Sequence, residues 1–251
     1  MTEWIYKGFI FWYLCGVILL TFDLLPPFLE WANAVFLILA GTLAVIYFIK
    51  SYGKWIGFTY SLIIFYLSIY VEHLGVEYDF LFGSYHYTDN FGMMIFGVPI
   101  TIGFAWLLIM GCSHELARGI TSQMPERAKP IIFVLIGSLI AVTMDLILDP
   151  VSYLIKEYWI WHDSGLYYGI PFSNFSGWFW LAALLHALFF LLRKIKKGPS
   201  LDTQWQFRMG YLFLAINGMF CLIALTGGLV GAVLLVVGLS ILWYFLYLKW
   251  R

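Results

Sequence analysis

Charged residues are scarce in this sequence. Asp, Glu, Lys and Arg make up 11% of its 251 residues, whereas hydrophobic residues make up 63%. A soluble domain carries about 25% charged residues, so this chain cannot cover a surface that faces water. The 14 basic and 14 acidic residues cancel, which gives no indication of a polyanionic partner such as nucleic acid. The composition therefore predicts a protein whose solvent is lipid.

Several familiar site patterns are also missing. The cysteines lie inside apolar runs and are typical of small core residues, not of a disulfide frame: Cys15, Cys112 and Cys221. His114-Glu115 begins like the helix of a zinc protease, but that motif needs a second His where Arg118 stands. His73 and His86 could join acids around a metal, yet they lack metal-ligand spacing. With no Gly-rich phosphate loop and no Ser nucleophile elbow, we expect no metal and no nucleotide.

Long apolar segments are what the sequence does contain. A helix needs about 20 apolar residues to cross the hydrocarbon core of a membrane. We assign eight such segments: 6–23, 31–49, 55–72, 95–117, 130–149, 175–193, 207–225 and 228–248. The last two are joined only by Thr226-Gly227-Gly228, which predicts a tight hairpin. The prediction is an all-α, polytopic membrane protein with about eight transmembrane helices, in which residues 1–251 form a single transmembrane domain.

The basic residues give this protein a predicted orientation. Thirteen of the 14 Lys and Arg residues lie at the termini or in alternate connections: Lys7, Lys50, Lys54, Arg118, Arg127, Lys129, Arg193, Lys194, Lys196, Lys197, Arg208, Lys249 and Arg251. Only Lys156 falls on the other side. The positive-inside rule then places both termini in the cytoplasm. We expect a multi-pass protein of a bacterial or archaeal cell membrane.

Acids gather at the ends of spans on the opposite, outer side. An ionisable group within a span is costly and usually faces the bundle interior, where it has a function. Four acids meet this description: Asp23, Glu72, Asp145 and Asp149. Asp145 and Asp149 are four residues apart and share one helix face, so the pair can hold one proton at neutral pH, as an acid and a base working together require. The structural alternative is a carboxylate that caps backbone N–H groups or pairs with a cation. Glu115, three residues from Arg118 at the cytoplasmic end, fits a surface ion pair.

The two long outer connections, 73–94 and 150–174, are rich in Tyr, Trp, Gly and Pro. An aromatic belt at the level of the lipid headgroups would explain single Trp and Tyr residues, but it does not explain the acids. A Gly-x-Pro step follows the first connection, at Gly97-Val98-Pro99, and another lies near the end of the second, at Gly169-Ile170-Pro171; each leads into the next span. Because Pro fixes φ and Gly permits tight turns, each connection is expected to return rigidly to the membrane.

Residues 72–106 and 145–178 carry a set of motifs: Glu72-x-x-Gly75, Phe82-Gly83-Ser84-Tyr85-His86-Tyr87-Thr88, Gly97-Val98-Pro99, Asp145-x-x-x-Asp149-Pro150, Trp159-Ile160-Trp161 and Gly169-Ile170-Pro171-x-x-Asn174-Phe175-Ser176-Gly177-Trp178. Together these motifs resemble a family of membrane-bound carotenoid biosynthesis enzymes. The family includes the CruF-type carotenoid 1',2'-hydratases and the bisanhydrobacterioruberin hydratases. One departure is Val76-Glu77-Tyr78-Asp79, which adds two acids where relatives commonly have a Thr-Gly step.

The resemblance implies hydration of the terminal C=C of an acyclic carotenoid (psi) end group to a tertiary alcohol. Such a hydratase is a carbon–oxygen lyase, and it needs no cofactor because hydration is redox-neutral. The substrate would be an apolar carotenoid or isoprenoid taken from the bilayer. In this hypothesis the catalytic residues are Glu72, Asp145 and Asp149. Either Asp donates the proton, and Glu72 orients and deprotonates water; the sequence does not fix which carboxyl is acid and which is base.

The remaining site residues are expected to bind substrate: Tyr85, Tyr87, Trp159, Trp161, Asn174 and Trp178. Tyr and Trp faces can each stabilise a carbocation by about 0.5–2 kcal/mol, and an Asn amide can hold water or an acid. Two other functions stay open. A carotenoid or isoprenoid cyclase or isomerase could use the same acid-generated carbocation, and a non-catalytic lipid-binding or transport protein could share the topology. Acids at one face, not at the midplane, argue against a transporter.

Overall fold

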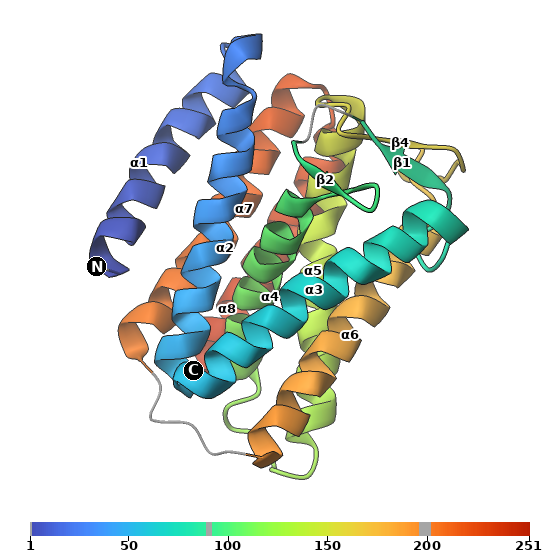
Figure 1. Cartoon of the computed structure of the whole chain (residues 1–251). Helices are drawn as coiled ribbons and strands as arrows, with labels where there is room; N and C mark the ends of the chain where they lie inside the picture. Colours follow the sequence, from blue (N-terminus) through green and yellow to red (C-terminus); the bar gives the residue numbers. More distant parts are fainter. Residues whose placement is uncertain (1, 89–91, 196–201) are drawn as a thin grey trace.

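The computed structural model describes residues 2–88, 92–195 and 202–251, and within these ranges eight long helices form a bundle (Figure 1). Their bounds are Thr2–Thr21 (α1), Trp31–Tyr52 (α2), Lys54–Tyr78 (α3), Ile100–Ile120 (α4), Lys129–Leu154 (α5), Phe172–Ile195 (α6), Thr203–Thr226 (α7) and Val230–Trp250 (α8). The short elements are η1 (Pro27–Leu29), β1 (Tyr85–Tyr87), β2 (Met94–Ile95), β3 (Val98–Pro99) and β4 (Trp159–Trp161). Each long helix in the described ranges has the length and hydropathy of a membrane span, so the predicted fold class is confirmed.

The chain ends and the basic connections gather at one end of the bundle. Both termini lie away from strands β1 and β4 (Figure 1). The connections after α2 and α4 and the end of α6 lie at that same end, whereas Lys156 follows α5 at the opposite end, which we name the strand end. Lys196 and Lys197 lie outside the described residues. The basic residues that the structure describes in these segments therefore gather at the end opposite the strand end. That this end faces the cytoplasm stays a prediction.

Helix α4 forms the centre of the bundle and is the most buried of the long helices, whereas α1 is the least buried. Small residues along α4 allow this packing. A Cβ atom on Gly103 would lie 2.6 Å from the Phe65 ring of α3, and one on Gly111 would lie 2.7 Å from Ala44 Cβ of α2. Close approach through small residues is typical of helices that pack within membranes.

The fourth helix begins later than the sequence predicts. The apolar run places the start of the span at residue 95, but β2 and β3 pair there, with Met94 opposite Pro99 and Ile95 opposite Val98. The two turn residues, Phe96 and Gly97, have φ values of 52° and 75°. Positive φ at both positions is the conformation of a tight β-hairpin, so helix α4 starts only after Pro99.

The fifth helix ends later than predicted. Its expected end at residue 149 was wrong, because α5 continues through Pro150 to Leu154. Proline has no N–H, so the carbonyl of Leu146 loses its helical partner. The Tyr167 hydroxyl donates to that carbonyl at 2.6 Å. A side chain from the following connection thus supplies the missing hydrogen bond, and Asp149 lies more than one turn inside the helix.

Strands β1 and β4 join the two outer connections at the strand end (Figure 1). They are antiparallel, with Tyr85 opposite Trp161 and Tyr87 opposite Trp159. Because side chains alternate along a strand, these four aromatics share the face toward the bundle and the intervening His86 points away. On the outside, His86 Nδ1 lies 2.8 Å from Nε2 of His162, a residue 76 positions further along the chain. The pairing thus joins distant segments into one wall.

Candidate functional site

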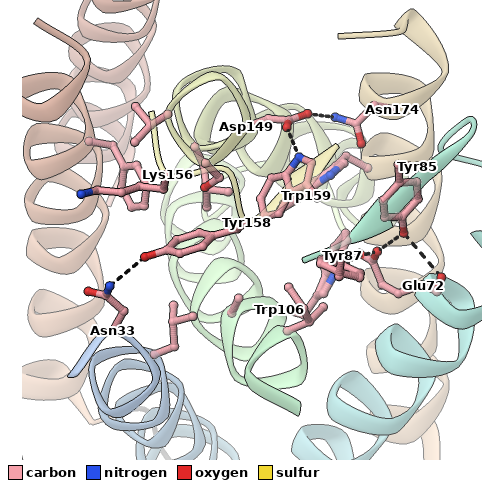
Figure 2. A pocket seen from close by; sticks show the side chains of 18 of the residues that line it. Asn33, Glu72, Tyr85, Tyr87, Trp106, Asp149, Lys156, Tyr158, Trp159 and Asn174 are labelled. Carbon is pink, nitrogen blue, oxygen red and sulfur yellow. Dashed lines mark hydrogen bonds between the residues drawn. The ribbon is translucent and has the colours of Figure 1, made fainter. Parts of the chain in front are cut away.

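Glu72 occupies the last two turns of α3 and is buried with an exposed fraction of 5%. Three donors reach its carboxyl group. Tyr85 and Tyr87 donate their hydroxyls to Oε2 at 2.5 and 2.9 Å, and Trp106 Nε1 donates to Oε1 at 3.0 Å (Figure 2). Donors held by β1 and α4 therefore fix the carboxyl group in one orientation.

Asp149 of α5 is held in a similar way from the other strand. The indole N–H groups of Trp159 and Trp161 donate to Oδ1 at 2.7 and 3.3 Å. The Asn174 amide of α6 donates to Oδ2 at 2.6 Å and also to Asp145 Oδ2 at 3.0 Å. Asn174 thus links the two Asp side chains, as their shared helix face predicts. Asp145 Oδ1 is buried and has no hydrogen-bond partner in the described part of the chain.

The strand pair supplies donors to both carboxyl groups. Tyr85 and Tyr87 come from β1 and serve Glu72, whereas Trp159 and Trp161 come from β4 and serve Asp149. Burial raises the pKa of the Tyr85 and Tyr87 hydroxyls well above the ordinary value, and the neighbouring Glu72 acts in the same direction. Both hydroxyls therefore stay protonated and remain donors.

Glu72 and Asp149 line one cavity at the strand end (Figure 2). Its empty space is about 940 Å³, a volume that includes its open mouth. Most of the wall is apolar or aromatic, and Trp106 and Trp178 stack within it with ring centroids 4.5 Å apart. Asp145 is not among the described residues that line the cavity and reaches it only through Asn174. Two carboxyl groups therefore share an aromatic chamber with room for an apolar group between them.

The cavity has a second polar edge that the sequence did not lead us to expect. Asn33, near the start of α2, donates from Nδ2 to the Tyr158 hydroxyl at 2.7 Å and to Glu30 Oε2 at 2.8 Å. Lys156 lines the same edge (Figure 2). An amide inside an apolar run, as at Asn33, was the available signal. A buried Trp within a span was the signal for Trp106, because its N–H needs a partner.

Three outer acids lie apart from the site. Asp23 is exposed beyond the end of α1, and Glu77 and Asp79 are exposed at the end of α3. None of the three lines the cavity among the described residues. The structure therefore brings together Glu72, Asp145 and Asp149 and leaves Asp23 out.

Glu115 does not form the surface ion pair that its position suggested. Its contact with Arg118 is present, at 2.6 Å, but Glu115 is fully buried. Tyr47 of α2 and Tyr247 of α8 each donate to it at 2.8 Å. The expected surface location was wrong, because Glu115 lies on the central helix, α4. The Glu115 carboxyl group links α4 to α2 and α8 in the half of the bundle away from the cavity.

The described residues contain no group of three or more His, Cys, Asp or Glu side chains placed to hold a metal ion. His73 Nδ1 lies 2.9 Å from the Phe96 carbonyl oxygen. The chemistry that the cavity itself can support is proton transfer by carboxyl groups, together with stabilisation of positive charge by aromatic faces.

Comparison with known proteins gives one family. The profile described as "Carotenoid biosynthesis protein" matches residues 32–243, which include the described residues that line the cavity, except Leu20 of α1. Neither the search of curated proteins nor the search of solved structures gives a match. On the extent of the profile match, the chain belongs to the carotenoid biosynthesis protein family.

Proposed function

We propose that this protein is a cofactor-independent hydratase that adds water to the terminal C=C of an acyclic carotenoid end group. The observation that carries the proposal is the placement of Glu72 and Asp149 on one aromatic cavity, each held by three N–H or O–H donors. An alkene needs a proton donor, a cation-stabilising wall and a base for water. The cavity offers a group for each requirement.

The first step is protonation of the alkene. Asp145 and Asp149 share the Asn174 amide, and two carboxylates so close repel each other, so the pair holds one proton. Asp149 faces the cavity and is the donor. Its proton adds to the less substituted alkene carbon, the π electrons form the new C–H bond, and a tertiary carbocation and a carboxylate remain.

The second step is capture of water. The faces of the cavity aromatics stabilise the cation, each by about 0.5–2 kcal/mol. Glu72 accepts a proton from the attacking water as the C–O bond forms, which gives the tertiary alcohol. Each turnover thus moves one proton from the Asp pair to Glu72, and solvent water at the strand end returns it. In this scheme Asn174, Tyr85 and Tyr87 are positioning residues, because they act through the carboxyl groups.

The site's position in the bundle suits both reactants. It lies at one end of helices long enough to cross a membrane, where water is near. Its wall is largely apolar, as a carotenoid end requires. The family membership supports a carotenoid as the substrate class.

Expression in a lycopene-accumulating bacterium tests the proposal. The wild-type protein is expected to convert lycopene into pigment heavier by one or two water molecules. Asp149→Asn should lower conversion by about 10²–10⁴-fold, the usual contribution of a general acid. Asp23→Asn is the matched control, because Asp23 is an exposed acid outside the cavity, and it should convert lycopene normally.

Products of any other mass would contradict the proposed hydratase activity. A new pigment of unchanged mass would identify a cyclase or isomerase that uses the same cation. Recovery of unmodified lycopene from cells that contain the folded protein would favour a binding or transport role. Equal conversion by Asp149→Asn and Asp23→Asn would remove Asp149 from the mechanism.

A further inference from the structure

A second hollow lies beside the cavity, between α1 and α2. We name it the α1–α2 crevice; it is lined on the α1 side by Trp12, Cys15, Gly16 and Leu19. Leu20, Asn33 and Phe36 line both the crevice and the cavity. The two hollows therefore adjoin at the residues that line both, and the crevice lies on the side of the cavity where α1 forms the edge of the bundle (Figure 1).

Sparse packing of α1 leaves this crevice open. Among the spans of the described chain, α1 is the least buried. Directional contacts hold it: Trp12 Nε1 donates to the Ala32 carbonyl at 3.1 Å, and the Tyr13 hydroxyl donates to the Ala215 carbonyl at 2.9 Å. A Cβ atom added to Gly16 would meet nothing within 4 Å. Gly16 lines the crevice, so a side chain added there has open space in front of it.

The chemistry of the crevice fits a hydrocarbon chain. Apart from Asn33, its described lining carries only hydrophobic side chains and Gly16. Both hydrogens of the Asn33 amide have partners, since Nδ2 donates to Glu30 and to Tyr158. A buried donor costs free energy when it lacks an acceptor. Because both amide hydrogens of Asn33 have acceptors, a hydrocarbon chain can lie beside this residue without that cost.

We propose that the α1–α2 crevice binds the polyene chain of the substrate while the chain's end occupies the carboxyl cavity. This inference rests on the proposed function for the identity of the end group. A carotenoid is far longer than the cavity and dissolves in the bilayer, so most of its chain must leave the site through an apolar opening. The crevice provides that opening on the side of the least buried helix.

A chain-length comparison tests the crevice. Gly16→Phe adds a ring to the crevice wall at a position where an added Cβ atom meets nothing within 4 Å. Gly8→Phe is the matched control, because Gly8 is on the same helix, also has open space around an added Cβ atom, and does not line the crevice. The measured quantity is the ratio of conversion of lycopene to conversion of a short acyclic isoprenoid with the same end group. Gly16→Phe should lower this ratio by about tenfold or more, since displacing two buried chain carbons has that effect. Gly8→Phe should leave it unchanged.

A binding measurement keeps the test independent of turnover. In a Glu72→Gln background, lycopene is not consumed, and a bound polyene gives induced circular dichroism in its visible absorption band. Adding Gly16→Phe should abolish that signal, and adding Gly8→Phe should retain it. If Gly16→Phe left both the conversion ratio and the circular dichroism signal unchanged, the proposal that the crevice binds the polyene chain would be overturned. Failure of the wild-type protein to change the mass of either substrate would instead overturn the proposed function.

Discussion

Replacing Glu72 by Gln is the substitution with the sharpest expected outcome. The side chains have the same shape, but Gln has an amide N–H₂ in place of one carboxyl oxygen. The Trp106 indole can only donate, so the Gln oxygen must face it. The amide then faces Tyr85 and Tyr87, whose hydroxyls can rotate to accept. The variant can therefore keep its partners while losing its charge and its ability to take up a proton.

The magnitude follows from these contacts. A hydrogen bond to a charged group contributes about 1.5–3 kcal/mol and a neutral one about 0.5–1.5 kcal/mol, so three weakened bonds cost about 3–4 kcal/mol. Removing the buried charge recovers a desolvation penalty of several kcal/mol, and we expect the unfolding temperature to change little. Loss of a general base should lower turnover by about 10²–10⁴-fold, or about 3–5 kcal/mol of barrier.

The assay is conversion of lycopene per folded protein, with folding measured by thermal unfolding in detergent. Glu115→Gln is the control, because Glu115 is also a buried carboxyl with three donor residues but lies away from the cavity. Glu115→Gln should lower stability, since it leaves Arg118 without its partner, and should keep turnover per folded molecule. Full turnover by Glu72→Gln would refute the reasoning, and so would an equal loss of turnover in both variants.

Three further predictions concern the supports of the site. Tyr167→Phe removes the hydroxyl that donates to the Leu146 carbonyl opposite Pro150 and should cost about 1–3 kcal/mol of stability; an unchanged unfolding temperature would contradict this. Gly177→Ala places a Cβ atom 2.9 Å from the backbone oxygen of Leu81, in the turn before β1, and should lower the free energy of unfolding by about 1–3 kcal/mol. Gly218→Ala is its control, because an added Cβ atom there meets nothing within 4 Å, and it should not destabilise α7. Burial raises the pKa of Tyr85 well above its ordinary value of 10.0, so a pH profile should show no loss of turnover from Tyr85 ionisation up to about pH 10.

The number and type of the long helices could be predicted because membrane spans leave a strong, local signal in the sequence. Helix ends could not, since tertiary contacts decide them. Pro99 marks the start of α4 after a hairpin, whereas Pro150 lies within α5, where Tyr167 replaces the lost hydrogen bond. Both prolines look alike in the sequence. Their difference lies in a partner that is distant along the chain.

The pairing of β1 with β4 was also beyond the sequence prediction, which assigned both segments to connections. The alternation in Tyr85-His86-Tyr87 and in Trp159-Ile160-Trp161 is the period of a strand. Strands of three residues are too short for that pattern to be distinctive, and their register depends on the helices that carry them.

For the site, the acids could be predicted because carboxyl groups are rare and costly in membrane spans. The helical spacing of Asp145 and Asp149 predicted that they share one face, but it did not indicate that Asn174 of α6 links them. The hydrogen bonds of Glu72 could not be predicted, since its donors come from a strand and from α4. The Asn33–Tyr158 edge was missed because the amide of Asn33 marks a polar position within a span but does not indicate its partner, which is 125 residues away along the chain.

The most direct test of the central claim is the source of the oxygen atom in the product. Purified protein in vesicles that contain lycopene is incubated in heavy-oxygen water, and the pigment is analysed by mass spectrometry. If carboxyl groups in the cavity add water across the terminal double bond, the tertiary alcohol carries heavy oxygen in the proportion of the solvent, and Glu72→Gln yields almost none. A product without oxygen, or with oxygen of ordinary mass, would contradict the account.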